Sequence, residues 1–264
     1  MLEAVNLKVG YDERIIIKDL SISINKGEIT SIIGPNGCGK STLLKSLSRM
    51  ISPKQGEIFL ESENIKNMKS KKISQKLCLL SQYNAAPNDL TVEQLVYYGR
   101  IPHKKWYETR TKEDTEILEW AIKETGLVEF KERPIGTLSG GQQQRAYIAQ
   151  ALAQKSDILL LDEPTTYLDI SFQLELMELV RQINEKLDIT IIMVLHELNQ
   201  ASRYSDRLII MQEGTIVADG RPEVVITRDI MRQVYCIKCE IDKDPISQKP
   251  RINPIKTIEN EEIS

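Results

Sequence analysis

The stretch Gly34-Pro35-Asn36-Gly37-Cys38-Gly39-Lys40-Ser41 matches the pattern G-x-x-x-x-G-K-[ST]. It follows residues 28–33, which read as a strand, and leads into residues 40–50, where leucines recur at helical spacing. Glycines let the backbone curl so that successive N–H groups point at phosphate oxygens, and a helix N-terminus adds favourable partial charge. Because a strand and a helix flank the motif as this mechanism requires, a phosphate-binding loop is preferred over a plain Gly-rich turn.

The same motif predicts individual roles. Lys40 is expected to reach the β- and γ-phosphates of a nucleotide, and the Ser41 hydroxyl is expected to ligate Mg²⁺. The predicted nucleotide-binding residues of this segment are Gly34, Pro35, Asn36, Gly37, Cys38, Gly39, Lys40, Ser41 and Thr42.

Composition sets the class of the protein. The chain has 264 residues, of which 41% are hydrophobic and 28% charged, with a formal net charge of −3. Enough Leu, Ile and Val are present for a sizeable core, which excludes disordered and fibrous proteins. No apolar run approaches the ~18 residues of a membrane span, and no basic stretch precedes an apolar one at the start, so a cytosolic protein is expected. The near-neutral charge disfavours general binding to nucleic acid.

Two local clusters leave alternatives open. Cys236 and Cys239 form a lone C-x-x-C pair, whereas a zinc site needs four ligands, so two thiols without a metal or redox role are preferred. A basic stretch surrounds Trp106 and Tyr107, and either a solvated loop or a docking surface explains it. Its cations are Arg100, Lys104, Lys105, Arg110 and Lys112.

Hydrophobic periodicity predicts a mixed α/β chain. Alternation at Leu20, Ile22 and Ile24 indicates a half-buried antiparallel strand, and residues 58–60 and 77–80 read as short strands. Helical spacing prevails between about 91 and 153, with capping boxes opening at Thr91 and Ser139. Continuous apolar runs at 158–161 and 189–195 indicate strands buried in a parallel sheet, separated by a helix, and 207–219 reads as a closing hairpin. The polar chain beyond Tyr235 gives little signal.

Two carboxylates end one of the buried strands. Asp162 and Glu163 follow the apolar run 158–161, at the edge of the sheet where phosphates are expected. Asp162 suits the Mg²⁺ shell, and Glu163 suits the polarisation of an attacking water molecule. A solvated acidic turn is disfavoured because the buried run fixes both acids at the edge of the core.

A second glycine motif, Leu138-Ser139-Gly140-Gly141-Gln142, opens a helix. Ser139 and Gln142 form the capping box, yet two glycines in a first helical turn cost stability. That cost suggests a ligand, and exposed N–H groups at a helix N-terminus can form a second anion site. Capping alone needs neither Gly140 nor Gly141.

Together these motifs resemble the nucleotide-binding subunit of ATP-binding cassette (ABC) transporters. Residues 138–142 resemble the family's signature, in order with the Walker A motif at 34–41 and the Walker B motif at 158–163. By this resemblance, Gln82 is the Q-loop glutamine, Asp169 the D-loop aspartate and His196 the switch histidine. Tyr11 resembles the aromatic residue that stacks on adenine.

The resemblance implies a fold and its boundaries. It implies a P-loop NTPase (RecA-like) core with an antiparallel β subdomain and an inserted α-helical subdomain. A single ABC ATPase domain is expected over 1–240, with its core at 1–82 and 156–240 and the helical subdomain at about 83–155. Residues 241–264 are expected to form a polar C-terminal extension.

The resemblance also implies a mechanism. Glu163, His196 and Gln82 are the expected catalytic residues, and Ser41, Gln82 and Asp162 the expected Mg²⁺ ligands. Two copies pack head to tail, so that ATP on one copy is capped by Ser139, Gly140, Gly141 and Gln142 of the other, with Asp169 beside it. Expected partners are a second ATPase subunit and integral membrane permease subunits, with an extracellular or periplasmic substrate-binding protein engaged indirectly and no nucleic acid. The expected location is the cytoplasmic face of the cell membrane.

Further segments resemble one branch of the family. Residues 90–93, 98–103 and 199–206 resemble ATPase subunits that import iron–siderophore, haem and cobalamin chelates, and 162–169 resembles the iron–siderophore members most. Glu197 and Cys236 depart from residues that are commoner in these relatives. The alternative is a soluble single-cassette ATPase that serves iron–sulfur cluster assembly, while a sensor without turnover is disfavoured by the full catalytic set. The cargo is not encoded in this chain, and either a surface position or a permease contact fits His103.

Overall fold

The computed structural model describes residues 1–82 and 86–258 of the chain. Packing divides it into two compact units, one formed by Met1–Asn67 and Thr190–Ser264 and the other by Met68–Ile189. The second unit is longer than the predicted helical subdomain, because it also takes in two strands and two helices that flank this subdomain in sequence. Within the described residues, we find no helix with the length and hydropathy that a membrane crossing requires.

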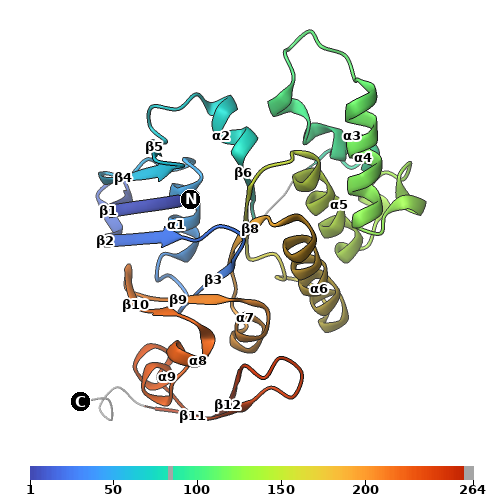
Figure 1. Cartoon of the computed structure of the whole chain (residues 1–264). Helices are drawn as coiled ribbons and strands as arrows, with labels where there is room; N and C mark the ends of the chain where they lie inside the picture. Colours follow the sequence, from blue (N-terminus) through green and yellow to red (C-terminus); the bar gives the residue numbers. More distant parts are fainter. Residues whose placement is uncertain (83–85, 259–264) are drawn as a thin grey trace. The chain divides into compact units, whose positions relative to one another are not determined.

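An antiparallel sheet forms part of the first unit. It contains β1 (Leu2–Tyr11), β2 (Arg14–Ile24), β4 (Gln55–Leu60) and the short β5 (Glu63–Asn64), in the order β2-β1-β4-β5. The alternating residues Leu20, Ile22 and Ile24 of β2 are all buried, as the sequence pattern predicts. Figure 1 shows β1, β2 and β4 side by side beside α1 (Lys40–Leu47).

A second group of strands in this unit is mainly parallel. Strand β3 (Ile29–Ile33) lies between β8 (Thr190–Val194) and β9 (Arg207–Gln212), parallel to both, and β10 (Thr215–Gly220) closes the group as an antiparallel hairpin with β9. Every residue of β3 and β8 is buried, including the polar residues Thr30, Ser31 and Thr190, as in a sheet that is covered on both faces. The loops after β3 and β8 therefore leave the same edge of the sheet.

The C-terminal segment is more ordered than the sequence suggests. After α7 (Leu198–Tyr204), α8 (Pro222–Val225) and α9 (Arg228–Tyr235), strands β11 (Ile237–Lys243) and β12 (Pro250–Thr257) form an antiparallel hairpin, drawn in red in Figure 1. Cys239 and Ile252 are buried in it, and the Asn199 side chain of α7 bonds both backbone groups of Ile252. The sequence beyond Tyr235 gives little signal for this hairpin, because residues distant in the chain stabilise it. The predicted boundary at 240/241 falls inside β11, and residues 259–264 of the expected extension lie outside the described residues.

The second unit combines two parallel strands with helices. Strands β6 (Leu77–Leu80) and β7 (Ile158–Asp162) pair in parallel. Thr91 and Ser139 cap their helices through reciprocal capping boxes as predicted, and Thr111 forms a third box. The helical elements are α2 (Ser70–Lys76), α3 (Val92–Tyr98), η1 (Ile101–His103), α4 (Lys112–Glu124), η2 (Val128–Phe130), η3 (Ile135–Thr137), α5 (Gly140–Ala153) and α6 (Ile170–Leu187).

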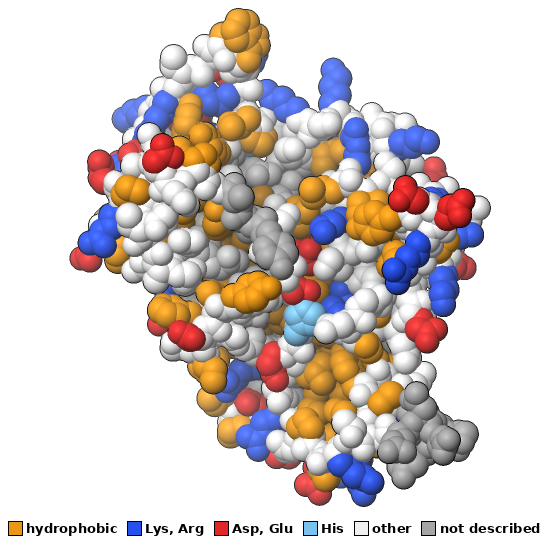
Figure 2. Space-filling view, turned by 180° about the vertical axis from the view of Figure 1, so that it is seen from behind, with side chains coloured by type: hydrophobic (Ala, Val, Ile, Leu, Met, Phe, Trp, Pro, Cys, Tyr) orange, Lys and Arg blue, Asp and Glu red, His pale blue; other side chains and the backbone are white. Residues whose placement is uncertain are grey.

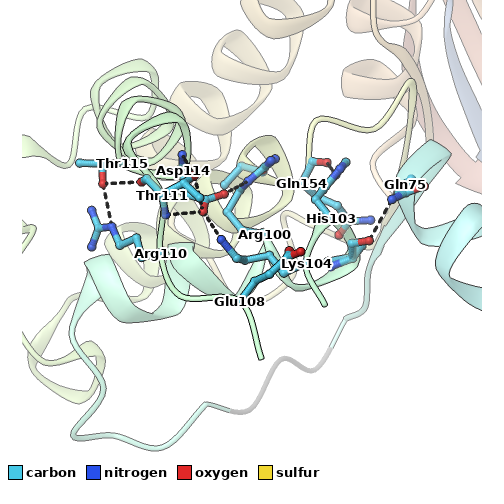
Figure 3. A network of polar contacts seen from close by, with 12 residues as sticks. Gln75, Arg100, His103, Lys104, Glu108, Arg110, Thr111, Asp114, Thr115 and Gln154 are labelled. Carbon is cyan, nitrogen blue, oxygen red and sulfur yellow. Dashed lines mark hydrogen bonds and ion pairs between the residues drawn. The ribbon is translucent and has the colours of Figure 1, made fainter. Parts of the chain in front are cut away.

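A buried carboxylate ties several of these elements together (Figure 3). Asp114 of α4 accepts from Arg100 Nε at 3.1 Å and from the Lys104 ammonium, and it also accepts from the Thr111 amide and hydroxyl. Arg100 reaches onward to the Ala153 carbonyl oxygen at 2.8 Å. Burial alone raises the pKa of Asp114, but the donors around it outweigh this and hold its pKa well below its usual range.

This network corrects the interpretation of the basic stretch. Arg100 is buried and Lys104 is half-buried, and both are paired with Asp114 instead of being exposed on a solvated surface. His103 is half-buried, and its Nε2 lies 2.6 Å from the Gln154 carbonyl oxygen, so it is not a freely exposed surface residue. Only Lys105, Arg110 and Lys112 of the predicted cations remain at the surface.

We expect Asp114→Asn to lower the free energy of unfolding by about 3 kcal/mol, because it leaves the buried Arg100 guanidinium without its counter-charge. Urea unfolding at neutral pH measures this, with the exposed neighbour Glu113→Gln as a control that changes stability by less than about 0.5 kcal/mol. Because the pKa of Asp114 is lowered in the folded state, its contribution is present above the unfolded pKa of ~4 and is lost as the pH falls further. The difference between wild type and variant must therefore narrow in acid, and a constant difference would contradict this assignment.

Candidate active site

The phosphate-binding loop joins β3 to α1 in the first unit. Gly34, Gly37 and Gly39 have φ values of 149°, 78° and 108°, a region that side chains strain to adopt. A Cβ on Gly34 would lie 2.1 Å from the Met211 carbonyl oxygen, so glycine is required there for close packing as well. Helix α1 begins after Gly39 with no side-chain cap and no acidic residue in its first turn. Its first amide groups therefore suit an anionic ligand.

Lys40 lies within this loop. Its Nζ donates to the carbonyl oxygens of Gly34 at 2.8 Å and Pro35 at 3.0 Å, and the residue is 5% exposed. These bonds place the ammonium group at the centre of the loop, where a phosphate would meet it. Burial raises the pKa of the neighbouring Cys38 thiol, so this cysteine is held as a small neutral side chain.

His196 comes to the same sheet edge as the phosphate loop. Ile32 of β3 pairs with Val194 of β8, so His196 leaves β8 beside the point where Gly34 leaves β3. The side chain is exposed, as a group that contacts a ligand must be. Glu197, the residue that departs from commoner sequences, caps α7 by accepting from the amides of Asn199 at 3.0 Å and Gln200 at 3.3 Å. A carboxylate one methylene longer than Asp therefore still fixes the turn after His196.

Tyr11 ends β1, and it is 48% exposed. It pairs with Arg14 at the turn of the β1–β2 hairpin, and Ile16 of the same hairpin lies 3.2 Å from a Cβ built on Gly39. The hairpin thus borders the phosphate loop. Stacking of Tyr11 on an adenine ring remains a prediction.

The second unit brings Gln82 and Glu163 together. Leu80 of β6 pairs with Leu161 of β7, so the two chains leave parallel strands side by side. Gln82 Nε2 donates to Glu163 Oε2 at 2.6 Å. Asp162 closes β7 and is 3% exposed, whereas Glu163 follows at a φ of 52° in the left-handed region. Such strain in a non-glycine residue persists where the surrounding structure enforces it. The left-handed backbone conformation directs the Glu163 carboxylate out of the strand.

One contact at this turn escapes the sequence reasoning. Thr166 Oγ1 lies 3.3 Å from Glu163 Oε2, so a threonine three residues onward helps to orient the carboxylate. Its only signal in the sequence is the spacing of three residues, which is common in turns. Asp169 lies at the N-cap of α6 and is exposed, and its side chain makes no capping bond.

The signature segment confirms the capping box and corrects the argument from its glycines. Gln142 N donates to Ser139 Oγ at 3.3 Å, and Ser139 N donates to Gln142 Oε1 at 3.0 Å. Gly141 is buried, and a Cβ there would lie 2.5 Å from Phe172 Cδ1 of α6. The absence of a side chain at Gly141 is therefore explained by helix packing and is not by itself a sign of a ligand, so the role of Gly141 at a nucleotide stays a prediction. Gly140 is exposed, and a Cβ there would meet only Leu168 Cδ2 at 3.7 Å, so the argument stands for Gly140 alone.

Comparison with known proteins decides the family. The family described as "ABC transporter" matches residues 17–166. The iron(3+)-hydroxamate import ATP-binding protein FhuC of Bacillus subtilis (strain 168) is 46% identical over 98% of this chain and 97% of its own. The chain belongs to the ABC transporter family. It is an ATP-hydrolysing protein of this family. A second relative, the ferric enterobactin transport ATP-binding protein FepC of Escherichia coli (strain K12), is 43% identical over 96% of this chain and 94% of its own.

Solved structures agree with this ABC fold. An inward-facing metal-chelate type ABC transporter superposes with a TM-score of 0.83 over 97% of both chains, at 24% identity, and it supports the fold alone. The dimeric, post-hydrolysis structure of the ATP-binding cassette MJ0796 with ADP and Pi superposes with a TM-score of 0.73 at 28% identity, over 84% of this chain and 98% of its own. The predicted ABC ATPase fold is thereby confirmed.

The predicted Mg²⁺ ligands of this ABC protein offer suitable chemistry. A hydroxyl from Ser41, an amide oxygen from Gln82 and a carboxylate from Asp162 are all hard oxygen donors, which Mg²⁺ prefers. Within the described ranges, no group of three or more His, Cys, Asp and Glu side chains could hold a metal ion, and this includes Cys236 and Cys239. Mg²⁺ usually binds through one or two carboxylates together with phosphates, so this set fits it and not a protein-only metal cage.

We expect Gly141→Ala to lower the free energy of unfolding by about 2 kcal/mol, because the added methyl group overlaps the Phe172 ring. Gly140→Ala is the matched control, and it should change stability by less than about 0.5 kcal/mol. The double variant Gly141→Ala/Phe172→Leu should recover part of the loss, as measured by chemical denaturation. Equal stabilities for the two alanine variants would show that Phe172 does not set the requirement for glycine.

Proposed function

We propose that this chain is the ATP-hydrolysing subunit of an importer that carries an iron–siderophore or a similar metal chelate. The observation that carries the catalytic part is the hydrogen bond of 2.6 Å between Gln82 and Glu163 at the ends of two parallel strands. The relatives named for import of iron(3+)-hydroxamate and ferric enterobactin support the class of cargo. The alternative, a soluble ATPase for iron–sulfur cluster assembly, is not favoured by these relatives.

In the proposed reaction, the phosphate loop holds ATP and positions its γ-phosphate. The amides that begin α1 and the Lys40 ammonium donate to phosphate oxygens, which requires Lys40 to exchange its bonds to Gly34 and Pro35 for bonds to the nucleotide. Tyr11 is proposed to stack on the adenine ring. His196 is proposed to hydrogen-bond the γ-phosphate from the end of β8.

Glu163 is the proposed base. Its carboxylate orients an attacking water and accepts a proton as the new oxygen–phosphorus bond forms, while the bond from the γ-phosphorus to the β–γ bridging oxygen breaks and ADP leaves. The Gln82 amide, which donates to Glu163, fixes the carboxylate and links it to the segment that enters the helical part of the second unit. Ser41, Gln82 and Asp162 are the proposed Mg²⁺ ligands, and the ion would offset negative charge on the β- and γ-phosphates.

The proposed active form is a dimer of two copies. The family resemblance implies that the nucleotide of one copy is capped by the signature residues of the other copy, with Asp169 beside them. These residues are Ser139, Gly140, Gly141 and Gln142. The amides of Gly140 and Gly141 are not used by the capping box, and Gly140 is exposed, which supports this role. Because ATP carries a γ-phosphate that ADP lacks, only ATP would favour the closed dimer, which is the differential affinity that a population shift needs.

The proposed partners are integral membrane permease subunits, with a substrate-binding protein acting indirectly on the other side of the membrane. Import ATP-binding proteins work with membrane permeases, and the proposed location is the cytoplasmic face of the membrane. Co-purification of the tagged chain with integral membrane subunits tests this. Recovery of the chain with soluble scaffold proteins alone would contradict the import proposal.

We expect Glu163→Gln to reduce kcat for ATP hydrolysis by about two or more orders of magnitude while ATP binding persists, because the variant keeps the hydrogen-bonding shape but loses the base. Gel filtration with ATP should then show a trapped dimer. Thr166→Val, which removes only the 3.3 Å contact to Glu163, serves as a graded control with a smaller loss. Normal hydrolysis by Glu163→Gln would refute the role of Glu163.

We expect Lys40→Ala and Ser139→Arg to separate binding from closure. Lys40→Ala removes the buried ammonium group and should weaken nucleotide binding itself. Ser139→Arg adds bulk at an exposed position and should prevent the ATP-dependent dimer while the monomer still binds ATP. Equilibrium binding of a fluorescent ATP analogue and gel filtration distinguish the two, and dimerisation of Ser139→Arg at the wild-type level would contradict the capping role.

A further inference from the structure

The loop 104–111 in the second unit carries two aromatic side chains into solvent. Trp106 is 96% exposed and Tyr107 is 61% exposed. The Glu108 amide donates to the Lys105 carbonyl oxygen at 3.0 Å, so Trp106 and Tyr107 occupy the centre of a β-turn. Their rings pack edge to face with centroids 5.6 Å apart. The result is a projecting apolar tip, and exposed apolar groups of this size indicate a contact surface.

Both ends of this loop are fixed on one buried group (Figure 3). Lys104 at the start and Thr111 at the end both bond to the Asp114 carboxylate, with Thr111 N and Oγ1 at 2.9 Å and 2.8 Å from Oδ2. Because the ends are held, the turn is presented in one position. A partner that binds it therefore pays little ordering entropy.

Basic side chains surround the tip. Helix α2 lies beside the loop, because Lys71 Nζ donates to the Lys104 carbonyl oxygen at 2.9 Å and Gln75 Nε2 donates to that of Pro102 at 3.0 Å. The stretch 68–82, which includes α2, contains no Asp or Glu. It supplies Lys69, Lys71, Lys72 and Lys76. In Figure 2, blue side chains predominate along the upper edge of the molecule, among a few hydrophobic ones.

The acidic groups that face this region neutralise only part of it. Glu108 lies 3.9 Å from Lys105, and Glu93 lies 2.8 Å from Arg110. Glu116 lies 3.8 Å from the Lys112 ammonium. The stretch 68–112 contains nine Lys and Arg against three Asp and Glu, so the segment that carries this surface has a positive net charge.

We propose that this basic–aromatic patch, formed by Lys69, Lys71, Lys72, Lys105, Trp106 and Tyr107, contacts the anionic headgroup surface of a lipid bilayer. Trp and Tyr favour the boundary between headgroups and acyl chains, and lysines are attracted to anionic lipids. The inference rests on the proposed function, since it gives a membrane-associated ATPase a lipid contact of its own beside its permease.

Fluorescence of the intact chain tests the aromatic part, because the chain has two Trp residues. Trp120→Phe leaves Trp106 as the only reporter, and Trp106→Phe leaves Trp120, whose ring lies under Lys155 Nζ at 3.4 Å. With vesicles of phosphatidylcholine and phosphatidylglycerol, we expect the Trp106 emission to shift to the blue and to gain protection from acrylamide. Trp120 emission should not change, and pure phosphatidylcholine vesicles should give a weaker Trp106 response.

Vesicle co-sedimentation tests the basic part. The double variant Lys71→Glu/Lys105→Glu should lower the partition coefficient for anionic vesicles by about ten-fold or more, since each lysine near such a surface contributes about a five-fold factor. Lys123→Glu, on the exposed side of α4, is the matched control and should retain wild-type binding. Added salt should weaken wild-type binding toward that of the double variant.

Two results would overturn the proposal. One is an unchanged Trp106 emission with every vesicle. The other is a response only to membranes of the expressing cells that trypsin treatment abolishes, because a protein would then hold the patch. ATP hydrolysis in solution is measured in parallel, and Trp106→Phe should keep it at the wild-type rate. Absence of ATP hydrolysis together with normal vesicle binding would contradict the proposed function but not the lipid contact.

Discussion

The chemistry of this protein depends on parallel strands that are buried on both faces. Along β3, β6, β7 and β8 the only charged side chain is Asp162, which ends β7, so the ionisable and amide groups of the site lie at the strand ends and in the loops that follow them. Pairing of β3 with β8 sets the phosphate loop and His196 at one edge, and pairing of β6 with β7 sets Gln82 against Glu163. In each unit, the register of one strand pair fixes which functional groups become neighbours. A shift of that register would separate these pairs while leaving each residue present.

The features that were predictable from the sequence are those encoded within a few residues. The phosphate loop, the capping boxes at Thr91 and Ser139, and the buried strand before Asp162 each follow from a local pattern with a local physical cause. The pairing of Gln82 with Glu163 is different, because the two residues are far apart in sequence. It was reached only through the family resemblance, which supplied their shared role and not the contact itself.

The features that were missed depend on residues distant in the chain. The β11–β12 hairpin is polar in sequence, and it is held by Asn199 of α7. The packing reason for glycine at position 141 was missed because nothing in residues 138–142 reveals that Phe172 lies against it. Arg100 and Lys104 looked like surface cations, since their counter-ion Asp114 is on a later helix. In all three cases a side chain from another element decides the environment, which periodicity cannot report.

The contact between Gly141 and Phe172 has a mechanical consequence. With no Cβ to hold the two helices apart, the first turn of α5 rests directly on the Phe172 ring near the start of α6. Close-packed interiors transmit displacement because they compress little. A displacement of Ser139 by another molecule would therefore shift the beginning of α6. The short connection that runs back through Asp169 to Glu163 would shift with it. Binding of a neighbouring molecule at Ser139 would in this way move Glu163, the proposed base, without any change in β7.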